Sequence, residues 1–281
     1  MSLKTVFVGP FIDSTVEDYS SLDSLIKYAI DLAGSQTAHL SVGIGLLKYS
    51  VPSAIIKEGR SIVSAANQER RQKTDQFAAD LAKRIQSSGL VSDLDITHDS
   101  YNSITRHLTR KARLADVAVL QPSSELLSLQ QGLVEEILFD SGRPVIVVPR
   151  KWNGTATPDR IMVSWDGSAK AARAIGDALP LLQSAKDVEI VCVSGDSNPT
   201  KKFDGADIAP HLARYCRSVN IVQLTASNGD VGAALREHAA LTKPNLLVMG
   251  AYAHARLTQM ILGGVTHSMI AEPPAPVFMS Y

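Results

Sequence analysis

Two segments in the second half of the chain carry residues that could hold a ligand. In the first, Asp166-Gly167-Ser168 directly follows an apolar, strand-like run. A residue at the carboxyl end of a parallel strand faces the place where open α/β sheets bind ligands. There the Asp166 carboxylate could accept a hydrogen bond from an adenine amino group or a ribose hydroxyl. The alternative is that Asp166 and Ser168 only stabilise the turn and cap the next helix.

The second segment contains glycines at a spacing suited to an anion. Gly250 ends an apolar run, and the pair Gly263-Gly264 comes just before a short helical pattern. Glycine lets the backbone approach a phosphate closely, and a helix N-terminus presents free N–H groups to it. Thr266 could add a hydroxyl in the first helical turn. The alternative is a tight turn with close packing of helix on strand.

The elements that must position these residues alternate between strand and helix, in an order that occurs twice. In the first half we expect strands at 5–8, 38–44, 94–97, 117–120 and 145–148, with helices at 21–32, 64–86, 103–114 and 133–139. In the second half we expect strands at 160–164, 188–193, 219–224, 245–249 and 277–279, with helices at 169–182, 209–217, 232–241 and 265–271. This alternation predicts an α/β fold built from βαβ crossovers and parallel sheets.

The repeat is also visible in the residues themselves. Residues 116–121 read Asp-Val-Ala-Val-Leu-Gln where 245–250 read Asn-Leu-Leu-Val-Met-Gly. The polar stretch 150–159 between the copies contains Gly and Pro, as linkers do. We therefore predict two domains, at 1–150 and 151–281.

The last strand of each copy is apolar and placed at the edge of its sheet. An unpaired apolar edge is an aggregation hazard. We therefore expect 144–149 and 276–281 to pair within one chain, which makes the monomer a pseudo-dimer with approximate two-fold symmetry. The sequence specifies no surface for a further homodimer.

Together, the two segments resemble the universal stress protein family. Its pattern is a strand-end aspartate followed by Gly-Ser, and later Gly-x2-Gly-x9-Gly-Ser/Thr. The first part appears here at 166–168. In the second part, Gly250 is followed by Ala253 in place of the middle glycine, and Gly263 by Gly264 in place of Ser or Thr. The resemblance implies a tandem member made of two Rossmann-like (HUP-type) domains, each an open five-stranded, mainly parallel sheet flanked by helices.

The resemblance also implies a ligand and the residues that bind it. In the ATP-binding members the acid contacts adenine, the end of the second strand lines the base pocket, and the glycine loop holds the phosphates. The residues at these positions here, with Thr266 added, are Asp166, Val193, Gly250, Ala253, Gly263, Gly264 and Thr266. The implied ligand is ATP or AMP, accompanied by Mg²⁺, and the implied role is that of a stress-response sensor or regulator.

Two departures from the family pattern keep a second interpretation open. Ala253 adds a methyl group where the backbone would approach a phosphate, and Gly264 lacks the family's hydroxyl. The alternative function is a nucleotide-independent structural or interaction module in stress signalling.

The first half departs much further from the pattern. Pro10-Phe11 stands where the second half has Trp165-Asp166, and residues 121–125 carry no glycine at the end of the fourth strand. We predict a degenerate domain that keeps the fold without the nucleotide site. Ser123 and Ser124 could hold another small polar molecule in its cleft.

Composition excludes several other classes of function. Lys plus Arg equals Asp plus Glu at 28 each, which removes the electrostatic basis for a nucleic-acid or membrane partner. No stretch approaches the ~20 apolar residues of a membrane span, and we expect a cytoplasmic protein. The two cysteines and seven histidines show no metal-binding spacing. We therefore predict no catalytic residues and no metal ligands, with at most weak ATP hydrolysis.

Overall fold

Both halves of the chain arrange their strands in the same order. The computed structural model describes residues 2–13, 16, 18–50, 57–122, 128–195, 205–256 and 259–281. The first half contains β1 (Thr5–Val8), β2 (Phe11–Ile12), a 3-10 turn η1 (Tyr19–Leu22), α1 (Asp23–Gln36), β3 (His39–Leu47), α2 (Lys57–Ser87), β4 (Ser92–Asp99), α3 (Tyr101–Arg113), β5 (Val117–Leu120), α4 (Leu129–Asp140) and β6 (Val145–Val147). Its strands lie in the order β4-β3-β1-β5-β6, with β2 continuing β1 along β3.

The second half repeats this order as β9-β8-β7-β10-β13. Its elements are β7 (Arg160–Ser164), α5 (Ala169–Leu182), β8 (Asp187–Gly195), α6 (Ala209–Leu212), β9 (Val219–Ala226), η2 (Ser227–Gly229), α7 (Val231–Thr242), β10 (Leu246–Gly250), β11 (Ala253–Arg256), β12 (Gln259–Leu262), α8 (Gly264–Ala271) and β13 (Val277–Ser280). Within each half the paired strands of the main sheet run parallel. The predicted α/β fold with two mainly parallel sheets is confirmed.

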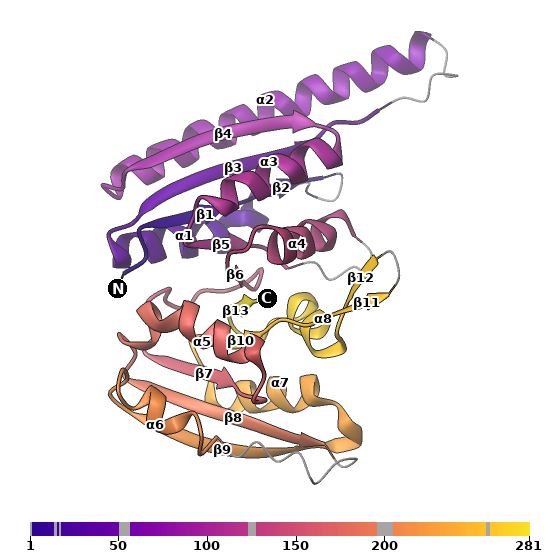
Figure 1. Cartoon of the computed structure of the whole chain (residues 1–281). Helices are drawn as coiled ribbons and strands as arrows, with labels where there is room; N and C mark the ends of the chain where they lie inside the picture. The colour runs from indigo at the N-terminus through magenta and orange to yellow at the C-terminus, as the bar shows by residue number, and fades with distance from the viewer. Residues whose placement is uncertain are drawn as a thin grey trace.

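The last strands of the two halves join them into one sheet (Figure 1). β6 and β13 pair antiparallel, with Ile146 opposite Phe278 and Val147 opposite Val277. The result is an 11-stranded sheet that runs through both halves. The predicted pairing of 144–149 with 276–281 within one chain is confirmed.

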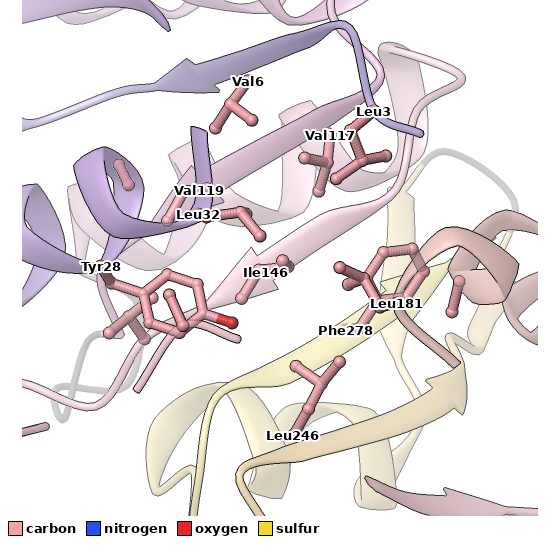
Figure 2. Packing of buried hydrophobic residues seen from close by; sticks show 14 of the residues in the cluster. Leu3, Val6, Tyr28, Leu32, Val117, Val119, Ile146, Leu181, Leu246 and Phe278 are labelled. Carbon is pink, nitrogen blue, oxygen red and sulfur yellow. The ribbon is translucent and has the colours of Figure 1, made fainter. Parts of the chain in front are cut away.

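Helices cover both faces of this sheet and bury a separate apolar cluster on each. One cluster draws on α1, α2, α5 and α6, and the other on α3, α4, α7 and α8. Both clusters contain residues of both halves. Figure 2 shows this for the first, with Val117 and Ile146 from one half near Leu181 and Phe278 from the other. The core is therefore continuous across the junction, and hydrophobic burial stabilises the junction itself.

Besides shifted element ends and the short elements β2 and η2, the structure differs from the expected elements in two places. The helix expected at 209–217 ends at Leu212 and continues as hydrogen-bonded turns. Leu212 is the buried residue of that helix, and a short helix with so little packed apolar surface gains little stability. The stretch expected as a glycine loop contains an antiparallel hairpin of β11 and β12, with Ala253 opposite Leu262. Within the described part of the chain, no helix combines the length and apolar character needed to cross a membrane.

Candidate functional site

The predicted residues gather where the strand order of the second half reverses. From β7 the chain proceeds outward to β8 and β9, and then returns to β10 on the other side of β7. β7 and β10 are parallel neighbours, with Val163 opposite Val248. In open α/β sheets the crevice at such a reversal, beyond the carboxyl ends of the strands, is the usual place for a ligand.

Asp166 connects the two segments that leave these strands. Its Oδ1 accepts the N–H of Ser168 at 3.1 Å, and its Oδ2 accepts the hydroxyl of Tyr252 at 2.8 Å. Gly167 between them has φ +71°, a left-handed conformation that favours glycine. Ser168 caps α5 by accepting the N–H of Ala171 at 3.0 Å. Asp166 thus stabilises the turn before α5, as the alternative interpretation predicted, and it also contacts the segment that follows β10.

Tyr252 is the centre of this arrangement. Its N–H donates to Oγ1 of Thr266 at 2.9 Å, and its carbonyl accepts the N–H of Gly263 at 2.9 Å. Both ends of the segment that holds the hairpin are thereby drawn together. Burial raises the pKa of the Tyr252 phenol, the Ser168 hydrogen bond opposes this rise, and the Asp166 carboxylate adds to it.

A lysine on α5 lies over two aromatic rings beside Asp166. Lys170 Nζ is 5.0 Å from the centroid of the Tyr252 ring and 3.7 Å from that of Tyr281. Burial lowers the pKa of the Lys170 ammonium group. The Tyr281 ring in turn packs edge-on against Phe139 of α4, with centroids 4.7 Å apart. These contacts connect the edge of the candidate site to a helix of the first half.

Gly250 has a packing role that requires no ligand. A Cβ added at Gly250 would lie 2.6 Å from the backbone nitrogen of Ala171 and 2.7 Å from the carbonyl carbon of Lys170. Because backbone atoms cannot move aside as a flexible side chain can, only glycine lets β10 and α5 approach this closely. The alternative of close helix–strand packing thus accounts for this glycine.

The glycine pair before α8 is arranged differently. Gly263 is the N-cap of α8 and provides no side-chain cap, and Gly264 is the first helical residue. A Cβ at Gly264 would meet no atom within 4 Å. Packing therefore does not demand glycine here, and the first-turn N–H groups of α8 have no capping side chain. Such a helix end has the polarity that attracts an anion.

The remaining predicted residues lie on the flanks of this arrangement. Val193 lies on β8 opposite Leu224, half-buried on the face that packs against the second apolar cluster. Ala253 is the first residue of the hairpin. Hydrogen bonds link Asp166, Thr266 and Gly263 through Tyr252, and among the described residues this network does not extend to Val193.

Sequence reasoning missed Tyr252 and Lys170, although a signal for Tyr252 exists. Asp166 lies two positions beyond the end of β7, and Tyr252 lies two positions beyond the end of β10. Residues at the same offset from two neighbouring parallel strands come close together at the sheet edge. Lys170 has no comparable signal, because its position follows from how α5 packs.

Side chains of the first half make contacts of their own at the corresponding edge. Arg70 of α2 donates to the carbonyls of Asp13 and Leu47, each at 2.7 Å, and its guanidinium lies 4.4 Å from the Tyr49 ring centroid. Gln121, which follows β5, donates to the carbonyl of Ser21. The predicted contacts of Ser123 and Ser124 lie outside the described residues.

Acidic, histidine and cysteine side chains do not form a metal site in the part of the chain that the structure describes. Mg²⁺ that binds with a nucleotide is commonly held by one or two carboxylates together with the phosphates, and Asp166 is a carboxylate of the candidate site.

Comparisons with known proteins point to one family. The sequence model of the universal stress protein family matches residues 158–280. The crystal structure of a universal stress protein from Archaeoglobus fulgidus DSM 4304 is similar over 98% of this chain and 97% of that chain, with TM-score 0.72 and 16% identity. A functionally unknown protein from Pseudomonas aeruginosa PAO1 covers 99% of this chain and 92% of its own, with TM-score 0.57 and 12% identity. No curated protein matches the sequence.

Proposed function

Because residues 158–280 belong to the universal stress protein family, we propose that this chain is a stress-response protein whose second half binds an adenine nucleotide, ATP or AMP. In this proposal the bound nucleotide is a signal, so that the protein acts as a sensor or regulator. The proposal includes the division into a nucleotide-binding unit at 151–281 and a degenerate unit at 1–150.

One observation carries the nucleotide proposal. The Asp166 carboxylate and the uncapped N-terminus of α8 are tied to the same residue, Tyr252, at the strand reversal. A carboxylate suits an amino or hydroxyl group of the nucleoside, and a helix N-terminus suits its phosphates. A nucleoside group bound at Oδ2 of Asp166 would replace the Tyr252 hydroxyl. Mg²⁺ would arrive with the phosphates.

A different observation favours the second candidate function, an interaction module that needs no nucleotide. Asp166 accepts hydrogen bonds from the N–H of Ser168 in its own turn and from the Tyr252 hydroxyl. Gly250 leaves room for the backbone of α5, and the Thr266 hydroxyl accepts the N–H of Tyr252. These contacts explain Asp166, Gly250 and Thr266 without a ligand. The two functions make opposite predictions for binding.

The test begins with the purified protein as it is isolated. We would denature it, resolve released nucleotides by chromatography, and then measure thermal shifts with ATP, ADP and AMP in the presence of Mg²⁺. A ligand at a hundredfold excess over Kd raises apparent stability by about 2.7 kcal/mol. The nucleotide proposal predicts a released nucleotide or such a shift, and loss of the shift in Asp166→Ala. Absence of both at millimolar nucleotide leaves the interaction module as the function.

Two variants sharpen this test. Asp159→Ala makes the same chemical change at the opposite end of β7, where Asp159 pairs with the exposed Lys186, and it should leave nucleotide binding unchanged. Gly264→Ser supplies the family's hydroxyl at a position where a side chain meets no neighbour. We expect it to strengthen nucleotide binding, because it adds a donor at the first residue of α8. If Gly264→Ser and the parent protein bind the nucleotide with equal affinity, the phosphates do not lie at the N-terminus of α8.

A further inference from the structure

The long helix α2 is held to the sheet by two kinds of contact along its length. It lies along β4 and continues past the carboxyl end of that strand (Figure 1). In residues 75–87 the side chains that are not exposed are apolar and pack into the first cluster: Phe77, Ala78, Leu81 and Ile85. In residues 60–74 the two fully buried side chains are polar, Asn67 and Thr74. We refer to residues 60–74 as the polar half of α2 and to 75–87 as its apolar half.

Hydrogen bonds attach the polar half to the rest of the chain. The Asn67 side chain exchanges two with the backbone of Tyr49, each 2.9 Å long. Arg70 donates to three backbone carbonyls at 2.7 to 3.3 Å, and Thr74 Oγ1 lies 2.9 Å from the hydroxyl of Tyr19. When a segment opens, water replaces such bonds, whereas nothing replaces buried apolar contacts. The polar half is therefore the part of α2 that opens more readily.

His98 of β4 faces this polar half. Side chains of a strand alternate between its two faces, and Leu94 and Ile96 pack against the first cluster, on the side of α2. His98 follows Ile96 by two positions and lies on the same face. Its Nε2 is buried and has no hydrogen-bond partner among the residues that the structure describes. A neutral imidazole can keep this nitrogen without a proton, but an imidazolium carries a hydrogen on both nitrogens and needs two acceptors.

The charges around His98 also oppose a positive imidazole. Burial is the main cause that lowers the pKa of His98. The positive charges of Arg71, Lys48 and Arg70 lower this pKa further. Asp75 has the opposite effect, but its carboxylate already pairs with Nε of Arg71 at 2.9 Å. Two of the three cations belong to the polar half, so a proton on His98 repels that segment directly.

We propose that the polar half of α2 is an acid-sensitive segment that opens when His98 takes up a proton. Once the segment is open, His98 meets water and its pKa returns to the usual value near 6.5. Because the open state binds the proton more tightly than the closed state, a fall in pH shifts the equilibrium toward opening. At higher pH the imidazole is neutral in both states, and the bonds of Asn67 and Arg70 keep the segment closed. This response does not involve the nucleotide proposed at Asp166, and it gives the protein a direct sensitivity to acid.

Hydrogen exchange measured by mass spectrometry tests this proposal on the full chain. Exchange at pH 7.5 and at pH 5.5, each corrected for the intrinsic rate, gives the opening constant of each segment. We expect the opening constant of the polar half to rise threefold or more on acidification, with about tenfold as the ceiling for one proton. The apolar half is the internal reference and should change less than twofold. An opening constant of the polar half that is equal at both pH values overturns the proposal.

Three variants assign the response to its groups. His98→Gln has a polar side chain that does not titrate, and its polar half should open equally at both pH values. His39→Gln removes a histidine that lies 3.6 Å from Asp93 at the start of β3, and it should keep the response of the parent protein. Arg71→Gln removes one of the cations and should reduce the response without abolishing it. Near-ultraviolet circular dichroism at both pH values shows that each variant is folded. A folded His98→Gln protein that responds to acid as the parent does overturns the proposal.

Discussion

The hydroxyl of Tyr252 lies 2.8 Å from Oδ2 of Asp166, and this hydrogen bond joins the segment that follows β10 to the segment that follows β7. Asp166 is exposed to solvent, and a hydrogen bond at such a site contributes about 1 kcal/mol or less to stability. Its main effect is to occupy the carboxylate oxygen to which the proposed nucleotide would bind.

Tyr252→Phe removes this bond and keeps the ring under Lys170. We expect the free energy of unfolding to change by less than about 1 kcal/mol, because both partners can turn to water. Nucleotide affinity should increase several-fold, since the ligand no longer displaces the hydroxyl. Titration calorimetry with ATP would measure this, with Tyr215→Phe as a control distant from Asp166. A drop in affinity would mean that the Tyr252 hydroxyl contacts the nucleotide itself.

Gly250 and Gly264 should respond differently to the same substitution. Gly250→Ala places a methyl group 2.6 Å from the Ala171 nitrogen, and overpacking of this kind costs about 1–3 kcal/mol. Gly264→Ala meets no neighbour and should change the free energy of unfolding by less than about 0.5 kcal/mol. Urea denaturation of both variants measures the difference. Equal effects at the two positions would contradict the packing role of Gly250.

Tyr28 of α1 contains a buried hydroxyl that has no hydrogen-bond partner among the described residues. An unsatisfied buried polar group is unfavourable by about 1–3 kcal/mol. Tyr28→Phe should therefore leave the protein at least as stable at neutral pH, with a gain of about 1 kcal/mol. Thermal unfolding would show the gain, and a clear loss of stability would indicate that the hydroxyl has a partner.

Burial also raises the pKa of Tyr28 well above its usual range. Below the unfolded pKa near 10 the phenol is neutral in both states, and its contribution to folding is constant. As the pH rises beyond 10, the unfolded chain ionises and the folded chain does not. The parent protein should then lose up to about 1.4 kcal/mol per pH unit relative to Tyr28→Phe. Urea titrations between pH 9 and 11 would reveal it, and parallel pH profiles would contradict it.

The junction between the halves should behave as one cooperative unit. Ile146 and Phe278 are opposite each other across β6 and β13 and are both fully buried. Truncation to alanine should cost about 2–5 kcal/mol for each, and the double variant should lose at least 0.5 kcal/mol less than the sum. Ile85→Ala of α2 combined with Phe278→Ala is the control, and this pair should be additive. Additivity of the Ile146 and Phe278 changes would mean that β6 and β13 stabilise their own halves separately.

Local signals in the sequence predicted much of the fold. The helix expected at 169–182 matches α5 because Ser168 caps it and its buried residues recur at helical spacing. The pairing of the last strands followed from their apolar character. The hairpin of β11 and β12 was not predicted, because it lies between two glycine positions that suggested an open loop.

The candidate site was harder to predict than the fold. Asp166 could be placed at the sheet edge from sequence because a strand end fixes its location. The role of Gly250 could not be predicted, because it depends on how closely α5 crosses β10. The residues in contact are about 80 positions apart in the sequence, and no local pattern encodes the distance between them. The same applies to Arg70, which reaches from α2 to the strand ends of the first half.

The pairing of β6 with β13 has a consequence for assembly. Two separate domains that paired through such strands would associate in a second-order reaction, and they would dissociate on dilution. Here the short connection between β6 and β7 holds the two strands in one chain, at an effective concentration on the order of millimolar or above. The association is therefore intramolecular and independent of the amount of protein in the cell. The first half therefore stays paired with the second whether or not it binds a ligand of its own.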